Sequence, residues 1–143
     1  MIFQFVGSIE IWSFHPDPTR AINNACWYVE RRIPGAISRK VETLVWCRRR
    51  LFASGTSGLL IEFDAAFNVA REIPASAGGV VAMVANEELG KIALASIDGT
   101  IVIYDVEEDG LVYDKTMEKR TERIMSLAWH ADGNVGNVED DGL

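Results

Sequence analysis

Short apolar runs separated by polar, glycine-containing turns make up most of the chain. The runs are rich in β-branched and aliphatic residues, as in 59–63 and 101–106, and the turns carry pairs such as Ser57-Gly58 and Asp98-Gly99. Runs of this kind bounded by such pairs are typical of β-hairpins. No segment sustains the 3.6-residue periodicity of an amphipathic helix. The pattern therefore predicts an all-β protein.

Three kinds of run recur in a fixed order. A run that follows a glycine turn occurs three times, at 7–12, 58–64 and 99–105. A small-residue run precedes that glycine twice, at 51–58 and 92–99. A further apolar run occurs three times, at 42–46, 81–85 and 125–130. With a looser strand at the end of each unit, the repeat holds four strands in about 41 residues, which is the length of a β-propeller blade.

The repeat defines the expected fold class and domain organisation. Residues 101–106 are apolar on both faces, which suits a sheet packed between two others. We expect a partial, unclosed β-propeller of about 3.5 blades of four antiparallel strands. The predicted segments are a blade remnant at 1–40, blades at 41–78 and 79–120, the start of a fourth at 121–135, and an acidic, disordered tail at 136–143.

Signature residues at repeat-equivalent positions resemble those of WD40 proteins. The pairs Phe63-Asp64 and Tyr104-Asp105 stand where WD40 repeats carry Trp-Asp, and Trp129-His130 opens a turn similar to the one after the innermost WD40 strand. The remaining signature residues, which we expect to be structural, are Trp12 and Trp46. Trp12, Trp46 and Trp129 lie within apolar strand patterns, which predicts packing in the core.

Longer blocks resemble one branch of the WD40 proteins in particular. The blocks at 41–55, 58–64 and 123–130, together with 7–12, stand in the order found in the first blades of the cirhin-like proteins of the small-subunit processome, which are associated with the U3 small nucleolar RNA. The resemblance covers roughly residues 3–135, and it implies a chain that is truncated relative to that family.

The resemblance also implies a function. Members of that family are non-catalytic scaffolds in small-subunit rRNA maturation and processome assembly, and they support transcription of the ribosomal genes. It implies a location in the nucleus and nucleolus, other processome proteins as partners, and indirect contact with pre-rRNA or the U3 ribonucleoprotein. It implies no membrane and no small-molecule substrate. The alternative is a WD40 adaptor that joins proteins in another intracellular complex.

Composition narrows the possible chemistry. The net charge of −7 argues against a nucleic-acid binder that uses its whole surface, and two cysteines without a CxxC pair predict reduced structural thiols. No signal peptide or membrane-length apolar run occurs in the sequence. His15 and His130 belong to no ligand-spaced cluster. We therefore expect no enzyme activity, no catalytic residue, no metal site and no cofactor.

A basic turn is the most distinctive charged feature. Arg48, Arg49 and Arg50 occupy a tight turn between two predicted strands, and Arg39 and Lys40 extend the basic character. Two interpretations remain open. The turn is either simply solvated, or it contacts a phosphate or an acidic partner, because guanidinium groups pair bidentately with such groups.

Overall fold

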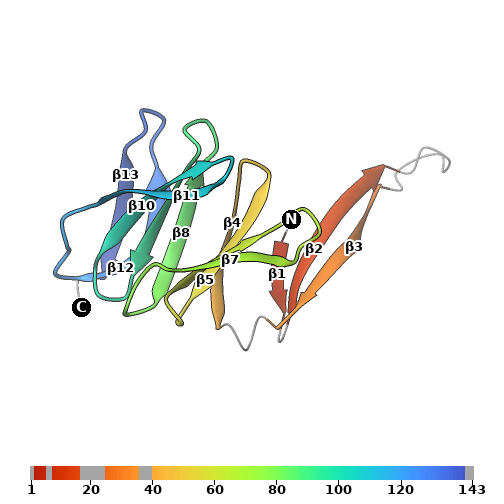
Figure 1. Cartoon of the computed structure of the whole chain (residues 1–143), viewed down its shortest axis with the longest axis horizontal. Helices are drawn as coiled ribbons and strands as arrows, with labels where there is room; N and C mark the ends of the chain where they lie inside the picture. The colour runs from red at the N-terminus through yellow and green to blue at the C-terminus, as the bar shows by residue number, and fades with distance from the viewer. Residues whose placement is uncertain (1, 6–7, 17–24, 36–39, 141–143) are drawn as a thin grey trace. The chain divides into compact units, whose positions relative to one another are not determined.

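The computed structural model describes residues 2–5, 8–16, 25–35 and 40–140, and every regular element in this part of the chain is a β-strand (Figure 1). It divides into two units, residues 1–39 and 40–143. No helical segment of membrane-spanning length and hydropathy occurs among the described residues.

The first unit contains one three-stranded antiparallel sheet. Its strands are β1 (Ile2–Phe5), β2 (Ser8–Pro16) and β3 (Ala25–Pro34), and β2 lies in the middle. Glu10 on β2 is buried, and its carboxylate pairs with Arg32 Nε at 2.8 Å and accepts a hydrogen bond from Trp12 Nε1 at 3.1 Å. This carboxylate therefore has partners for both of its oxygens, as a buried charge requires.

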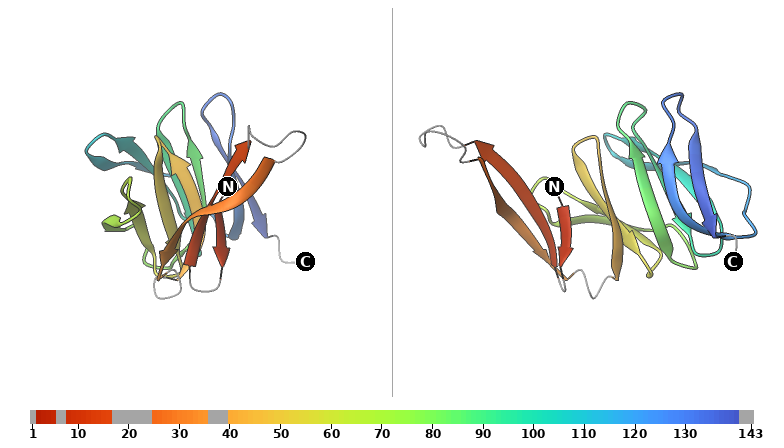
Figure 2. Two further views of the ribbon diagram at one scale, coloured as in Figure 1. Left: turned by 90° about the vertical axis from the view of Figure 1, so that its right-hand side faces the viewer. Right: turned by 180° about the vertical axis from the view of Figure 1, so that it is seen from behind.

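The second unit contains three antiparallel sheets. The first consists of β4 (Val41–Cys47), β5 (Arg50–Gly55), β6 (Leu59–Phe63) and β7 (Val69–Pro74). The second consists of β8 (Val80–Asn86), β9 (Lys91–Ser96), β10 (Ile101–Glu107) and β11 (Gly110–Thr116). The third contains β12 (Arg123–Trp129) and β13 (Val135–Asp140). The sheets stack in chain order, with β8 in contact with both β4 and β12 (Figures 1 and 2).

Strand β9 of the second sheet is buried on both faces. On β9, Ile92 and Leu94 join the core cluster shared with the β4–β7 sheet, whereas Ala93 and Ala95 join the cluster shared with β12. Successive side chains of a strand point to opposite faces, so both sets must be apolar. This explains why the sequence here shows no alternation of apolar and polar positions.

The repeated glycines are required by the backbone. Gly58 and Gly99 have φ values of 72° and 86°, a region that L-residues seldom occupy. A Cβ at Gly58 would lie 1.9 Å from Ser76 O, and one at Gly99 would lie 2.4 Å from Arg120 O. Each glycine therefore marks the point where the chain after the fourth strand crosses close to the start of the third.

The observed architecture confirms the expected all-β class of unclosed, antiparallel four-stranded sheets. One expectation needs correction at the C-terminal end. The sequence predicts a disordered tail from residue 136, but residues 135–140 form β13, which pairs with β12 from Trp129↔Val135 to Arg123↔Asp140. The apolar β12 beside it provides a partner strand, and pairing overrides the weak strand propensity of these residues.

Candidate interaction surface

Three hairpin turns lie at one end of the second unit. They connect β4 to β5, β8 to β9, and β12 to β13, and they project in the same direction in Figures 1 and 2. The basic turn of the sequence is the first of these. Its neighbour carries Glu87 and Glu88, which are exposed.

Arg48 and Arg49 adopt an unusual backbone conformation. Their φ values are 47° and 61°. Two successive residues with positive φ match the right-handed twist of a tight hairpin, but the position normally selects Asn or Gly. An L-residue with a Cβ costs about 1–2 kcal/mol in this region. Both arginines are exposed, so the strained turn presents positive charge to solvent.

The turns also contact one another. Arg48 N donates to Glu87 Oε2 at 2.8 Å, and a Cβ at Gly90 would lie 2.1 Å from Arg48 Nε. In the same way, a Cβ at Gly133 would lie 3.0 Å from Leu89 Cδ1. Each turn therefore lies against a glycine of the next turn, which fixes the position of Arg48 but leaves Arg49 without a partner among the described residues.

Arg50 does not belong to the exposed turn. Its guanidinium donates to Glu62 Oε1 at 2.7 Å and to Glu107 O, and it lies over the Phe52 ring at 5.8 Å. The side chain is 21% exposed and Glu62 is 6% exposed, so this is a largely buried ion pair within the first sheet. The hydrogen bond to Glu107 O crosses to the second sheet. Arg50 therefore holds sheets together and is not available to a partner in this state.

The remaining basic residues do not extend the turn. Lys40 immediately precedes β4, whereas Arg48 follows it, so a strand of roughly 20 Å separates them. Arg39 lies outside the described residues. The structure therefore brings together Arg48 and Arg49 and places Lys40 at the opposite end of the sheet.

The signature residues of the repeat have different environments. Phe63 and Tyr104 are buried. Trp12 is half-buried, and Trp129 is also half-buried and donates from Nε1 to Val84 O at 3.3 Å. Trp46 is 40% exposed and contacts Phe67 edge-on with a centroid distance of 6.1 Å, so the expectation of core packing is wrong for this residue. Its position on β4 is apolar in sequence but faces outward.

The polar signature residues form hydrogen bonds within turns and ion pairs with nearby side chains. Asp64 Oδ1 accepts hydrogen bonds from Ala66 N and Asn68 N at 2.8 and 2.9 Å, which closes the turn after β6. Asp105 pairs with Lys91 Nζ at 2.6 Å. His130 Nδ1 lies 2.9 Å from Asp132 Oδ1 in the exposed turn after β12.

No group of three or more potential metal ligands occurs within the described ranges. Cys47 is buried, and its Sγ lies 3.9 Å from both Asn86 O and Lys91 O. Burial, followed by the nearby Glu87 carboxylate, raises the pKa of this thiol to about 11. The thiol is therefore protonated at neutral pH and serves packing, because nucleophilic chemistry requires the thiolate.

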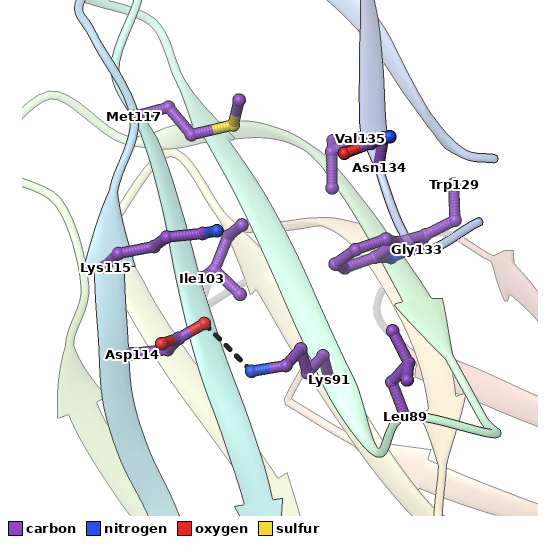
Figure 3. Close-up of a pocket in the computed structure, with 10 residues that line it drawn as sticks. All are labelled: Leu89, Lys91, Ile103, Asp114, Lys115, Met117, Trp129, Gly133, Asn134 and Val135. Carbon is purple, nitrogen blue, oxygen red and sulfur yellow. Dashed lines mark hydrogen bonds and ion pairs between the residues drawn. The ribbon is translucent and has the colours of Figure 1, made fainter.

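A groove between the second and third sheets is a site that the sequence did not indicate. It is lined by the β8–β9 turn, by β9, β10 and β11 with the residue that follows β11, and by the β12–β13 hairpin. The lining residues are Leu89, Lys91, Ile103, Asp114, Lys115, Met117, Trp129, Gly133, Asn134 and Val135 (Figure 3). We call it the outer groove. Lys91 Nζ pairs there with Asp114 Oδ2 at 2.8 Å.

Comparison with solved structures defines the class of fold. The β-propeller domain of Cps50 (Swd1) from Myceliophteria thermophila superposes with a TM-score of 0.64 over 94% of this chain and 46% of that chain, at 17% identity. The chain therefore has a β-propeller fold. No family model matches it.

Comparison with curated proteins adds a distant homology. The U3 small nucleolar RNA-associated protein 4 homologs of Homo sapiens and Mus musculus are each 27% identical over 129 residues, which is 89% of this chain. The chain spans 18% of the length of these relatives. It is a distant homologue of U3 small nucleolar RNA-associated protein 4, which confirms the resemblance drawn from the repeat motifs.

Proposed function

We propose that the chain is a non-catalytic WD40 scaffold segment that acts in the nucleolus in small-subunit ribosome biogenesis, through processome assembly and rRNA maturation. The observation that carries this proposal is the homology to U3 small nucleolar RNA-associated protein 4 over 89% of the chain. The described residues support a scaffold, because the hairpin-turn end presents exposed charged side chains to a partner.

Within this function, the Arg48–Arg49 turn is the proposed contact with a phosphate or an acidic partner surface. Arg49 carries an unpaired guanidinium in a strained conformation among the described residues. Strained backbone persists where the surrounding structure holds it, and such positions cluster at functional sites. An exposed guanidinium is suited to bidentate recognition of phosphate or carboxylate.

The test is sedimentation of the tagged chain from cells of its own organism. We expect the chain to migrate with U3-containing pre-ribosomal particles, and Arg49→Glu to reduce that association at least fivefold. Lys40→Glu is the matched control, because Lys40 is also exposed and has a similar φ of 50°, but lies at the other end of β4.

The outcomes separate the two parts of the proposal. Migration away from pre-ribosomal particles contradicts the nucleolar scaffold and leaves the adaptor of another complex. Association that persists in Arg49→Glu, or is lost equally in Lys40→Glu, contradicts the role of the turn.

A further inference from the structure

The end of the second unit that carries the Arg48–Arg49 turn changes sign from the first sheet to the second. Val106 N donates to Gly90 O at 2.7 Å, so the β10–β11 turn lies at the same end as the β8–β9 turn. These two turns of the second sheet expose the carboxylates of Glu87, Glu88, Glu107, Glu108 and Asp109. A positive turn on the first sheet therefore stands next to negative turns on the second.

The boundary between the two charges is fixed by Arg48. Its backbone N donates to Glu87 Oε2 at 2.8 Å, and its guanidinium lies over the buried Gly90, where a Cβ would come within 2.4 Å of Nη2 and 2.5 Å of Cζ. Arg48 is thus shared with the acidic turn. Arg49 on one side of this contact and Glu88 on the other are exposed and have no partner among the described residues.

An apolar side chain lies beside these charges. Leu89 follows Glu88 in the β8–β9 turn and is 47% exposed, although it lies between the β4–β5 turn and the β12–β13 turn. A Cβ at Gly133 would lie 3.0 Å from Leu89 Cδ1, so the side chain rests on the glycine of the following turn. The surface therefore offers a positive charge, an apolar side chain and a negative charge on neighbouring turns.

The charges at this end distinguish a nucleic acid from a polypeptide as the ligand. A nucleic-acid strand carries a phosphate on every nucleotide and binds through clustered Lys and Arg. Packed sheets lie about 10 Å apart, and charges interact over about 10 Å at 0.1 M salt. The carboxylates of the second sheet would therefore repel the phosphates next to one bound at Arg49. A polypeptide can instead present a single carboxylate and, further along, a cation.

We propose that the ligand of the Arg48–Arg49 turn is an extended polypeptide segment and not a nucleic-acid strand, an inference that rests on the proposed role of this turn as a partner contact. A carboxylate of the segment pairs with Arg49, an apolar side chain covers Leu89, and a lysine or arginine pairs with Glu88. Because an extended chain advances about 3.3 Å per residue, the two charges stand about three residues apart. Complementary charges of this kind select the partner more than they add affinity.

The probe is the synthetic peptide Lys-Leu-Ser-Glu-Leu-Ser-Lys with blocked termini, in which the carboxylate has a cation three residues away in both chain directions. It is titrated into the full chain, and the amide chemical shifts are followed by NMR. We expect saturable shifts at Arg49, Glu88 and Leu89. A single-stranded RNA of twelve nucleotides should give no saturable shifts at these amides.

Charge reversal tests the assignment of each contact. Arg49→Glu and Glu88→Lys should each weaken binding of the peptide at least threefold, and Leu89→Ser should weaken it about twofold. The double variant Arg49→Glu/Glu88→Lys should bind the charge-swapped peptide Glu-Leu-Ser-Lys-Leu-Ser-Glu at least threefold more tightly than the wild type does. Lys40→Glu is the matched control and should leave peptide binding unchanged, because Lys40 is exposed but lies at the other end of β4.

Absence of saturable shifts with the peptide, equal binding by the wild type and the charge-reversed variants, or failure of the double variant to prefer the charge-swapped peptide would overturn the proposal. RNA binding that shifts the Arg49 amide and is lost in Arg49→Glu would also overturn it, but would leave the turn as a phosphate contact. The nucleolar assignment is decided separately by the sedimentation experiment.

Discussion

The two interfaces between sheets in the second unit are built from the same repeat but are covered to different extents. The first interface, between β4–β7 and β8–β11, buries Phe52, Leu60 and Leu94 and continues outward to Val106. The second interface, between β8–β11 and β12–β13, has its cluster around Ile124 and Leu127 and opens into the outer groove. The difference shows that a propeller repeat specifies each interface jointly with its neighbour, because no single sheet covers its own faces.

The two interfaces also differ in how their charged residues are paired. In the first interface Arg50 is committed to Glu62 and Glu107, which belong to successive sheets. Lys91 is the first residue of β9, as Arg50 is of β5, but in the second interface it pairs only with two carboxylates of its own sheet, Asp105 and Asp114.

The largest expected difference between the interfaces concerns leucine truncation. Leu94→Ala removes a 2% exposed side chain from the first interface, and Leu127→Ala removes an 8% exposed one from the second. We expect the free energy of unfolding to fall by about 4 kcal/mol for Leu94→Ala and about 2 kcal/mol for Leu127→Ala, because an open site relaxes more easily around a cavity. Urea unfolding measures both, and equal losses would contradict the distinction between the interfaces.

The next effect comes from the buried ion pair. In the described structure Glu62 Oε2 has no hydrogen bond and lies 3.8 Å from Arg71 Nη1. Arg50→Ala also removes the partner of Glu62 Oε1, so the buried carboxylate loses its one close ion pair. We expect a loss of about 2 kcal/mol, below the roughly 3–5 kcal/mol of a fully buried pair that loses one partner, because Arg50 is partly exposed. Lys91→Ala in the second interface should cost less than about 1 kcal/mol.

A double variant provides the control for the ion pair. Combining Glu62→Gln with Arg50→Ala removes the uncompensated carboxylate and should recover part of the loss in urea unfolding. A double variant less stable than Arg50→Ala alone would show that the lost packing of Arg50 on Phe52, and not the buried charge, sets the cost.

Substitutions in the β4–β5 turn and the β12–β13 turn should change the stability of the chain in opposite directions. Arg49→Gly relieves a φ of 61° and should stabilise the chain by about 0.5 kcal/mol, since the gain is partly offset by the freedom of glycine in the unfolded chain. Gly133→Ala, at a φ of 88° in the turn of the third sheet, should destabilise by about 1 kcal/mol. Thermal unfolding of both variants checks the signs, and a destabilised Arg49→Gly would mean that the turn is not strained.

The smallest effect is a pH dependence confined to the second interface. Hydrogen bonds to Asp105 and then Asp114 raise the pKa of Lys91 above its ordinary value of 10.5. A lysine with a raised folded-state pKa contributes stability that is complete below the unfolded-state pKa and is lost as the pH rises through the folded-state value. The stability difference between the wild type and Lys91→Met should therefore narrow above pH 10.5. Arg50→Ala should show no such narrowing, because arginine keeps its charge.

Local sequence signals predicted the strands and turns of the complete sheets. Gly58 and Gly99 stood out because only glycine tolerates their backbone and the approaching carbonyl groups. The strand at 135–140 could not be predicted from its own residues, because β13 forms through pairing with β12 and not through its own strand propensity. The sequence also could not predict that Trp46 is exposed, since an apolar run does not indicate which face of a strand is covered by a neighbouring sheet.

The candidate sites were harder to predict from the sequence than the strands, because they depend on how the strands pair. Arg50 is adjacent to Arg49 in sequence but leaves the basic turn, because residues on a strand alternate in direction. Arg71 and Lys115 occupy equivalent places in the repeat, because each pairs with the residue four positions after the repeated glycine, Glu62 and Ile103. The sequence does not show this equivalence, because the turns between the third and fourth strands differ in length and register shifts occur at 103/104 and at 62/63. Only the strand pairing reveals it.

Hydrogen exchange of the backbone amides in the free chain tests the central comparison most directly. Amides of the central strands β9 and β10, which are covered on both faces, should exchange slowest, near the rate of global unfolding, because local opening must break both interfaces. Amides of β12 and β13 should exchange at least tenfold faster. Equal protection across the three sheets, or slowest exchange in β12 and β13, would contradict a complete first interface and a half-covered second one.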